Sequence, residues 1–155
     1  MSAPVDPRLR FVVCEDGAEY LERFRRFLGD AFDFFPAHDF REAQAAAAEA
    51  DALLLDLDFR RTPPERLVDE QGLAPAPLDA GTRSRLAETQ GILILRRLRA
   101  ASVTLPAILF ADLDGTGQVD FLMRTLAPLT VAGSRMGIAD IATLLRSFGP
   151  RGRTS

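Results

Sequence analysis

Apolar residues along the chain fall into two alternating patterns. Short apolar runs rich in β-branched and aromatic side chains predict five strands, at residues 9–14, 32–37, 52–56, 105–111 and 129–132. Between and after them lie helical segments, most with apolar residues every three or four positions, at about residues 20–28, 41–50, 83–100, 117–126 and 138–148. Strands and helices that alternate five times predict one α/β domain, with a parallel, doubly wound sheet covered on both faces.

The segment from residue 60 to about residue 82 breaks this alternation. It contains four prolines and no aromatic residue, and no period is sustained along it. Such a composition predicts a long loop, with a helical turn within residues 64–70. Its mixture of arginines and acids offers polar contacts to a partner or a lid. The alternative is a tolerated surface insertion without a function, because long loops add little closure entropy.

The predicted domain spans residues 9–148, between an N-terminal extension (1–8) and a tail (149–155) that we expect to be disordered. The 155 residues are 47% hydrophobic and 26% charged, which is typical of a globular protein. A net charge of −3 gives no general attraction to nucleic acid, and no apolar run is long enough to span a bilayer. The single cysteine, Cys14, is typical of a reducing compartment. We therefore expect a cytoplasmic protein that binds neither nucleic acid nor membranes.

Pairs of acidic residues follow three of the five predicted strands: Glu15 and Asp16 the first, Asp56 and Asp58 the third, Asp112 and Asp114 the fourth. Ligands of open α/β sheets bind beyond the carboxyl ends of the strands, so these pairs are candidates for one site. Carboxylate oxygens are the ligands that Mg²⁺ prefers. The alternative is that some of these acids are solvated loop residues or helix caps.

Three stretches resemble response-regulator receiver domains. FVVCEDGAEYLERF is similar to their first strand and helix, FREAQAAAAEADALLLDLD to their second helix and third strand, and GILILRRLRAASVTLPAILFAD to their third helix and fourth strand. The resemblance covers most of residues 9–148. It implies a flavodoxin-like sheet of five parallel strands in the order 2-1-3-4-5, with a long insertion (about 60–82) between strand 3 and helix 3.

The resemblance also implies a site. Asp56 matches the aspartate that accepts phosphate in this family. Glu15 and Asp16 match the acids that hold Mg²⁺ together with that aspartate. Asp58 matches the position whose backbone carbonyl completes the metal site.

Two positions depart from the receiver pattern. The family's Thr or Ser after strand 4, which hydrogen-bonds the phosphoryl group, is replaced by Ala111. The family's Lys-Pro after strand 5 falls near Gly133 and Ser134, and the chain contains no lysine at all. Arg135 lies close enough to supply a cation, but its planar fork differs from an ammonium group.

These departures favour an atypical receiver, or pseudo-receiver, which acts as a protein-interaction module without conventional phosphorylation switching and is not an enzyme. Its expected partners are proteins, such as a sensor kinase or a downstream signalling protein, and a homodimer is left open. One alternative is a response regulator that accepts phosphate on Asp56 with Mg²⁺. A weaker alternative is a phosphohydrolase of the haloacid-dehalogenase type, because ILFADLDGTG and LLLDLDFRRT are similar to its DxDGT motif.

Overall fold

The computed structural model describes residues 8–72 and 78–150, and these form the predicted α/β domain. Its strands are β1 (Arg10–Cys14), β2 (Asp33–Ala37), β3 (Ala52–Asp56), β4 (Ala107–Phe110) and β5 (Leu129–Ala132). All neighbouring strands are parallel, in the order β2-β1-β3-β4-β5. The predicted fold class, including the strand order, is confirmed.

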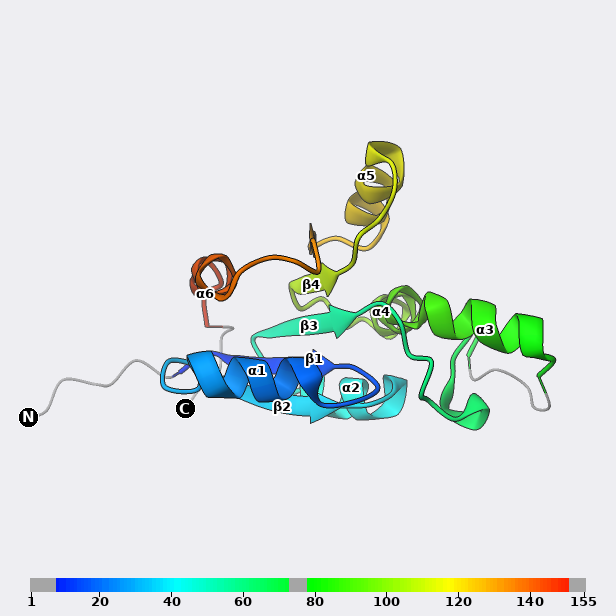
Figure 1. Cartoon of the computed structure of the whole chain (residues 1–155), viewed down its shortest axis with the longest axis horizontal. Helices are drawn as coiled ribbons and strands as arrows, with labels where there is room; N and C mark the ends of the chain where they lie inside the picture. The colour runs from blue at the N-terminus through cyan, green and yellow to red at the C-terminus, as the bar shows by residue number, and fades with distance from the viewer. Residues whose placement is uncertain (1–7, 73–77, 151–155) are drawn as a thin grey trace, which may run out of the picture.

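The described residues also form the helices α1 (Glu19–Leu28), α2 (Phe40–Ala47), α3 (Ala80–Glu88), α4 (Gln90–Ala100), α5 (Thr116–Thr125) and α6 (Ile138–Arg146), with a 3₁₀ turn at Pro64–Arg66. α1 and α6 pack on one face of the sheet, and α2, α4 and α5 pack on the other (Figure 1). α3 lies beyond the carboxyl ends of the strands, beside the insertion that follows β3 (Figure 1).

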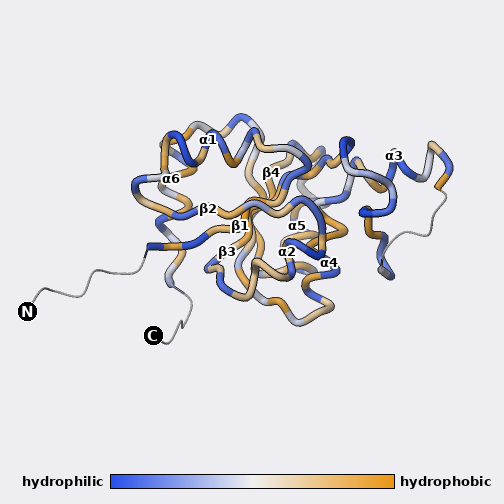
Figure 2. Tube along the Cα trace, turned by 90° about the horizontal axis from the view of Figure 1, so that it is seen from below, coloured by the Kyte–Doolittle hydropathy of each residue, from blue (hydrophilic) through white to orange (hydrophobic). Residues whose placement is uncertain are grey.

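The core has two parts because successive residues of a strand point to opposite faces of the sheet. Phe11 and Val13 face α1 and α6, whereas Val12 and Cys14 face α2 and α4. All four side chains are at most 2% exposed. Figure 2 shows hydrophobic residues concentrated along these central strands. Because both faces of the sheet are buried, a ligand or partner can reach the sheet only at the ends of its strands.

The single helix predicted at about residues 83–100 is wrong, because the structure has two helices there, α3 and α4. They are separated at Thr89, whose φ of −121° and ψ of 16° lie outside the α-helical region. The buried side chain of Gln90 explains the break. It accepts a hydrogen bond from the N–H of Val68 and donates to the carbonyls of Val68 and Leu86. Because α3 begins at Ala80, the insertion also ends earlier than predicted.

The first half of the insertion is part of the core. Phe59, Leu67 and Val68 are fully buried, and the predicted helical turn is present between them. Much of the insertion's charge is bound by the domain itself, in the ion pairs Arg61–Asp16, Arg61–Glu19, Arg66–Asp39, Arg66–Glu42 and Arg96–Glu70. These charges are therefore paired within the domain, and their predicted contact with a partner stays a prediction. A merely tolerated surface loop does not describe the first half of the insertion.

Within residues 8–72 and 78–150, no helix is both long and apolar enough to cross a membrane. The predicted N-terminal extension lies outside the described residues except for Arg8, and the predicted tail except for Gly149 and Pro150.

Gly91 at the start of α4 provides a test of how closely this helix approaches β3. A Cβ atom there would lie 2.0 Å from the carbonyl oxygen of Asp56. Because the backbone of a buried strand cannot move aside easily, we expect Gly91→Ala to lower the free energy of unfolding by about 2 kcal/mol or more. Urea denaturation measures this.

Gly81→Ala is the matched control, because Gly81 is also helical and the nearest atom to its added Cβ is a side-chain oxygen 3.4 Å away. We expect it to change the free energy of unfolding by less than about 1 kcal/mol. An equal loss in both variants would contradict the close approach of α4 to β3.

Candidate functional site

The carboxyl ends of β1 and β3 bring the first acids of the candidate site together. The two strands are neighbours, and Cys14 lies opposite Leu55. Glu15 and Asp16 follow β1 directly, and Asp56 is the last residue of β3. The negative charges of Asp16 and Glu15 both raise the pKa of Asp56, as expected for carboxylates that share one edge. The structure thus brings these three predicted site residues together.

The Glu15 side chain is buried and bound by the backbone. The residue is 2% exposed, and its two carboxylate oxygens accept hydrogen bonds from the backbone N–H groups of Tyr20 (3.1 Å) and Leu21 (2.9 Å). Burial raises the pKa of Glu15, and these two hydrogen bonds oppose the rise. Since the first N–H groups of a helix have no partner within it, Glu15 satisfies two of them at the start of α1.

Asp16 is bound by Arg61, the second arginine of the insertion. One oxygen of Asp16 accepts from Nη2 of Arg61 at 2.9 Å, and the other accepts from the backbone N–H of Arg61 at 2.9 Å. The same guanidinium forms a two-pronged ion pair with Glu19, with distances of 2.7 Å and 3.0 Å. Hydrogen bonding to Arg61 lowers the pKa of Glu19 to about 2. The Asp16 side chain is only 6% exposed, so Arg61 covers it.

Among the described residues, Asp56 has no cationic partner of this kind. Its Oδ1 accepts a hydrogen bond from the N–H of Leu57 at 2.8 Å. Burial is the main cause of a pKa raised to about 6, from an ordinary value near 3.8, and the hydrogen bond only partly opposes it. The neighbouring acids add to the rise. A substantial fraction of Asp56 is therefore protonated near pH 6.

Asp58, whose charge also acts on Asp56, is bound by the other arginine of the pair, Arg60. Its side chain accepts from the backbone N–H of Arg60 at 3.0 Å and forms an ion pair with Nε of Arg60 at 2.7 Å. The role of its backbone carbonyl in a metal site stays a prediction.

The residues at this edge do not fit a divalent cation. Within residues 8–72 and 78–150, no group of three or more His, Cys, Asp or Glu side chains is arranged to hold a metal ion. The oxygens of Glu15 are committed to backbone N–H groups and those of Asp16 to Arg61. Mg²⁺ is usually held by one or two carboxylates and several waters. Of Glu15, Asp16 and Asp56, only Asp56 keeps a carboxylate oxygen that accepts no hydrogen bond from another described residue.

The positions after β4 and β5 lack the groups that would contact a phosphoryl group. Asp56 lies opposite Phe110, the last residue of β4, so Ala111 is the first residue after that strand, and its methyl side chain is buried. Ser134 donates hydrogen bonds to Asp112 from its backbone N–H (3.0 Å) and from its hydroxyl. These bonds lower the pKa of Asp112. Asp112 thus links the loops after β4 and β5, with Gly133 close beside it.

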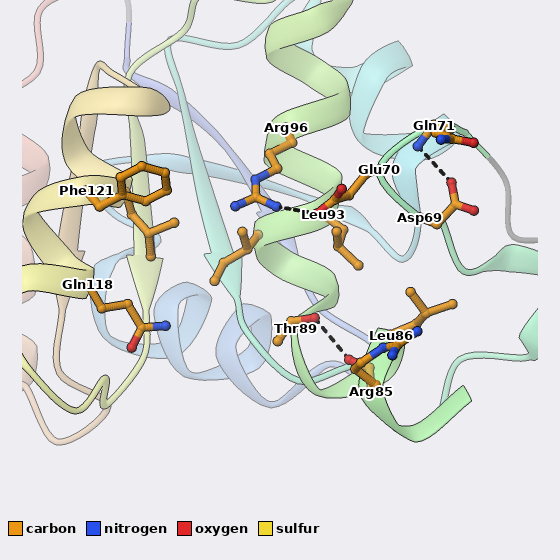
Figure 3. Close-up of a pocket in the computed structure, with 12 residues that line it drawn as sticks. Asp69, Glu70, Gln71, Arg85, Leu86, Thr89, Leu93, Arg96, Gln118 and Phe121 are labelled. Carbon is orange, nitrogen blue, oxygen red and sulfur yellow. Dashed lines mark hydrogen bonds and ion pairs between the residues drawn. The ribbon is translucent and has the colours of Figure 1, made fainter. Parts of the chain in front are cut away.

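A pocket of about 670 Å³ lies between the insertion, α3, α4 and α5. Figure 3 shows Phe121 of α5 at one side, Leu93 and Arg96 of α4 in the middle, and Glu70 of the insertion at the other side. The pocket is lined by Asp69, Glu70, Gln71, Arg85, Leu86, Thr89, Ile92, Leu93, Arg96, Gln118, Phe121 and Leu122. An apolar floor with a polar rim is typical of sites that bind a ligand or a partner's side chain.

Sequence reasoning missed both Arg61 and this pocket. A signal for Arg61 was present in the sequence. This arginine lies five residues after Asp56, the end of β3, and the neighbouring strand β1 is followed by the acids Glu15 and Asp16. Phe121 carried no signal, because an aromatic residue in a helix usually faces the core, whereas Phe121 is 50% exposed.

Neither a protein-family model nor a curated protein sequence matches the chain, but solved structures do. The receiver domain of Francisella response regulator 1452 is 16% identical, with a TM-score of 0.60 over 90% of this chain and 94% of that one. The Vibrio cholerae chemotaxis protein CheY4 is 13% identical, with a TM-score of 0.62 over 90% and 98%. The BeF3-activated receiver domain of Klebsiella pneumoniae RstA is 18% identical, with a TM-score of 0.59 over 88% and 95%. The chain therefore has the fold of response-regulator receiver domains, and the predicted resemblance is confirmed at the level of the fold.

The pKa of Asp56 predicts a pH dependence of stability. Because the folded state binds this proton more tightly than the unfolded state, the contribution of Asp56 to stability is fully present below about pH 4 and is lost as the pH rises through about 6. We expect Asp56→Asn to be more stable than the wild type at neutral pH, by about 1 kcal/mol after allowance for solvent screening. The difference should vanish near pH 4. Thermal unfolding at a series of pH values measures it.

Asp112→Asn is the control with the opposite sign, since its hydrogen bonds with Ser134 lower the pKa of Asp112. It should lower stability at neutral pH and lower it less in acid. If Asp56→Asn instead destabilised the protein at neutral pH, the uncompensated charge assigned to Asp56 would be wrong.

Proposed function

We propose that this protein is an atypical receiver-type signalling domain, which acts by binding other proteins and not by conventional phosphorylation switching. The observation that carries the proposal is Ala111. It stands next to Asp56 on the neighbouring strand, where a phosphoryl group on Asp56 would need a hydroxyl group as a hydrogen-bond donor. A methyl group offers none.

The loop after β5 supports the same proposal. Ser134 is bonded to Asp112, and the chain contains no lysine that could supply an ammonium group. Phosphorylation of Asp56 would therefore lack the hydroxyl and the ammonium through which it would move β4 and β5, and Arg135, which acts on Asp112, offers only a planar guanidinium instead. A ligand shifts a conformational equilibrium only through contacts that differ between the two states.

The protein is proposed not to be an enzyme. Asp112, the first acid of the ADLDGT stretch, is committed to Ser134. This commitment argues against a phosphohydrolase that uses Asp112 as its nucleophile.

The proposed contact surface is the pocket between the insertion, α4 and α5. Phe121, which lines it, is 50% exposed. Arg85 at the rim is exposed and forms no ion pair with another described residue, while Arg96 is already paired with Glu70. An apolar floor beside an available guanidinium fits a protein partner that inserts a large apolar side chain with a carboxylate next to it. Such a partner would be a kinase or a downstream signalling protein.

Loss of the phosphorylation switch can be tested with beryllofluoride, which mimics a phosphoryl group. In the presence of Mg²⁺, we expect the wild type to show no saturable binding and no shifts of β4 or β5 resonances in NMR spectra. The double variant Ala111→Thr, Ser134→Lys adds back the hydroxyl and the ammonium and serves as the comparison. Tight binding by the wild type, with large shifts in β4 and β5, would overturn the proposal.

The contact surface can be tested by comparing two exposed phenylalanines. Phe121 is 50% exposed in the pocket, and Phe27 is 57% exposed on α1. For a partner isolated with the wild type, we expect Phe121→Asp to weaken binding by about tenfold or more, because it places a charge in an apolar pocket. Phe27→Asp should leave the affinity unchanged. Equal effects of the two variants in calorimetric titrations would move the contact surface elsewhere.

A further inference from the structure

The guanidinium group of Arg61 occupies the acidic edge of the sheet, where the receiver fold would lead one to expect a metal ion. It forms an ion pair with Asp16 at 2.9 Å and a two-pronged ion pair with Glu19 at 2.7 Å and 3.0 Å. The backbone N–H of Arg61 adds a further hydrogen bond to Asp16. Charge-assisted, bidentate pairs of this kind are among the stronger hydrogen bonds in proteins.

Gly17 makes room for this guanidinium. A Cβ atom at Gly17 would lie 2.4 Å from Nη2 and 2.8 Å from Cζ of Arg61, and 2.4 Å from Oε2 of Glu19. Any other residue would push the guanidinium from its present position. Glycine between the acids of β1 and the start of α1 is thus a second, independent feature that accommodates Arg61.

A divalent cation would have to compete with these contacts. Both oxygens of Asp16 are used by Arg61, and both oxygens of Glu15 are used by the N–H groups of α1. Displacement of Arg61 would leave Glu19 without its partner as well. The guanidinium is charged at every physiological pH, so acidity does not release it.

We propose that Arg61 is the built-in counter-ion of Asp16 and Glu19 at the strand edge and replaces a divalent cation there, so that the domain is held in one state without metal. This proposal deepens the proposed function and rests on it in one respect: without phosphorylation of Asp56, the site does not need a metal ion. It also gives the insertion a defined task. The first residues of the insertion cross from β3 to the loop after β1 and tie the two together.

Tyr20 provides the probe for a direct test, because the chain has one tyrosine and no tryptophan. The charges of Asp56 and Glu15 act on this residue, so it lies beside the acid group. A bound Mn²⁺ ion would quench its fluorescence. We expect no saturable quenching of the wild type by millimolar Mn²⁺ and no rise of its melting temperature with Mg²⁺.

Arg61→Ala should bind Mn²⁺ at least roughly tenfold more tightly, because it leaves Asp16, beside Asp56, without its cationic partner. Mg²⁺ should then raise its melting temperature. Gly17→Ala keeps the arginine but displaces the guanidinium, and should show a smaller gain in the same direction. Arg60→Ala is the control, because Arg60 pairs with Asp58 and not with Asp16.

Circular dichroism shows whether each variant is folded. If Arg61→Ala does not fold, Gly17→Ala still provides the test. Saturable Mn²⁺ binding by the wild type, or no gain of binding in a folded Arg61 variant, would overturn the proposal. Neither outcome depends on beryllofluoride. The inference about Arg61 and the proposed loss of phosphorylation switching therefore fail or survive separately.

Discussion

Parallel strands end at a common edge, and the negative charge that gathers at that edge constrains the rest of this protein. Glu15, Asp16 and Asp56 meet there, and each is accommodated differently. Backbone N–H groups at the start of α1 bind Glu15, the guanidinium of Arg61 binds Asp16, and Asp56 retains a proton up to about pH 6. Two of these interactions also fix a neighbouring segment: that of Glu15 fixes the start of α1, and that of Asp16 fixes the start of the insertion. The third leaves one acid poised to change charge in a mildly acidic solution.

The insertion connects this edge to the proposed contact surface. It leaves β3 at Asp56, contacts Asp16 through Arg61, and then buries Leu67 and Val68 beneath the helix pair α3 and α4. The hydrogen bonds of Gln90 with Val68 hold its middle part, and the pair Glu70–Arg96 holds the wall of the pocket. In the proposed function, the segment that removes the need for a cation at the strand edge also shapes the surface that meets a partner.

Local patterns were sufficient to predict the five strands, because each contains a short apolar run, whereas the strand order came from the resemblance to receiver domains. β3 was predicted with its observed bounds, Ala52–Asp56, from such a run. The break at Thr89 was missed because it depends on Gln90 reaching back 22 positions to Val68. Arg61 was missed for the same reason, since its partner Asp16 lies 45 positions away. Substitutions such as Ala111 were visible in the sequence, but the commitment of Ser134 to Asp112 required the structure.

The account depends most directly on which cation holds Asp16. Crystals of the protein grown with an excess of Mn²⁺ would answer this question, because manganese is located unambiguously by its anomalous scattering. The account predicts no anomalous peak between Asp16 and Asp56, with Nη2 of Arg61 within hydrogen-bonding distance of Asp16. A manganese ion bound by both aspartates, with the guanidinium of Arg61 displaced into solvent, would contradict it.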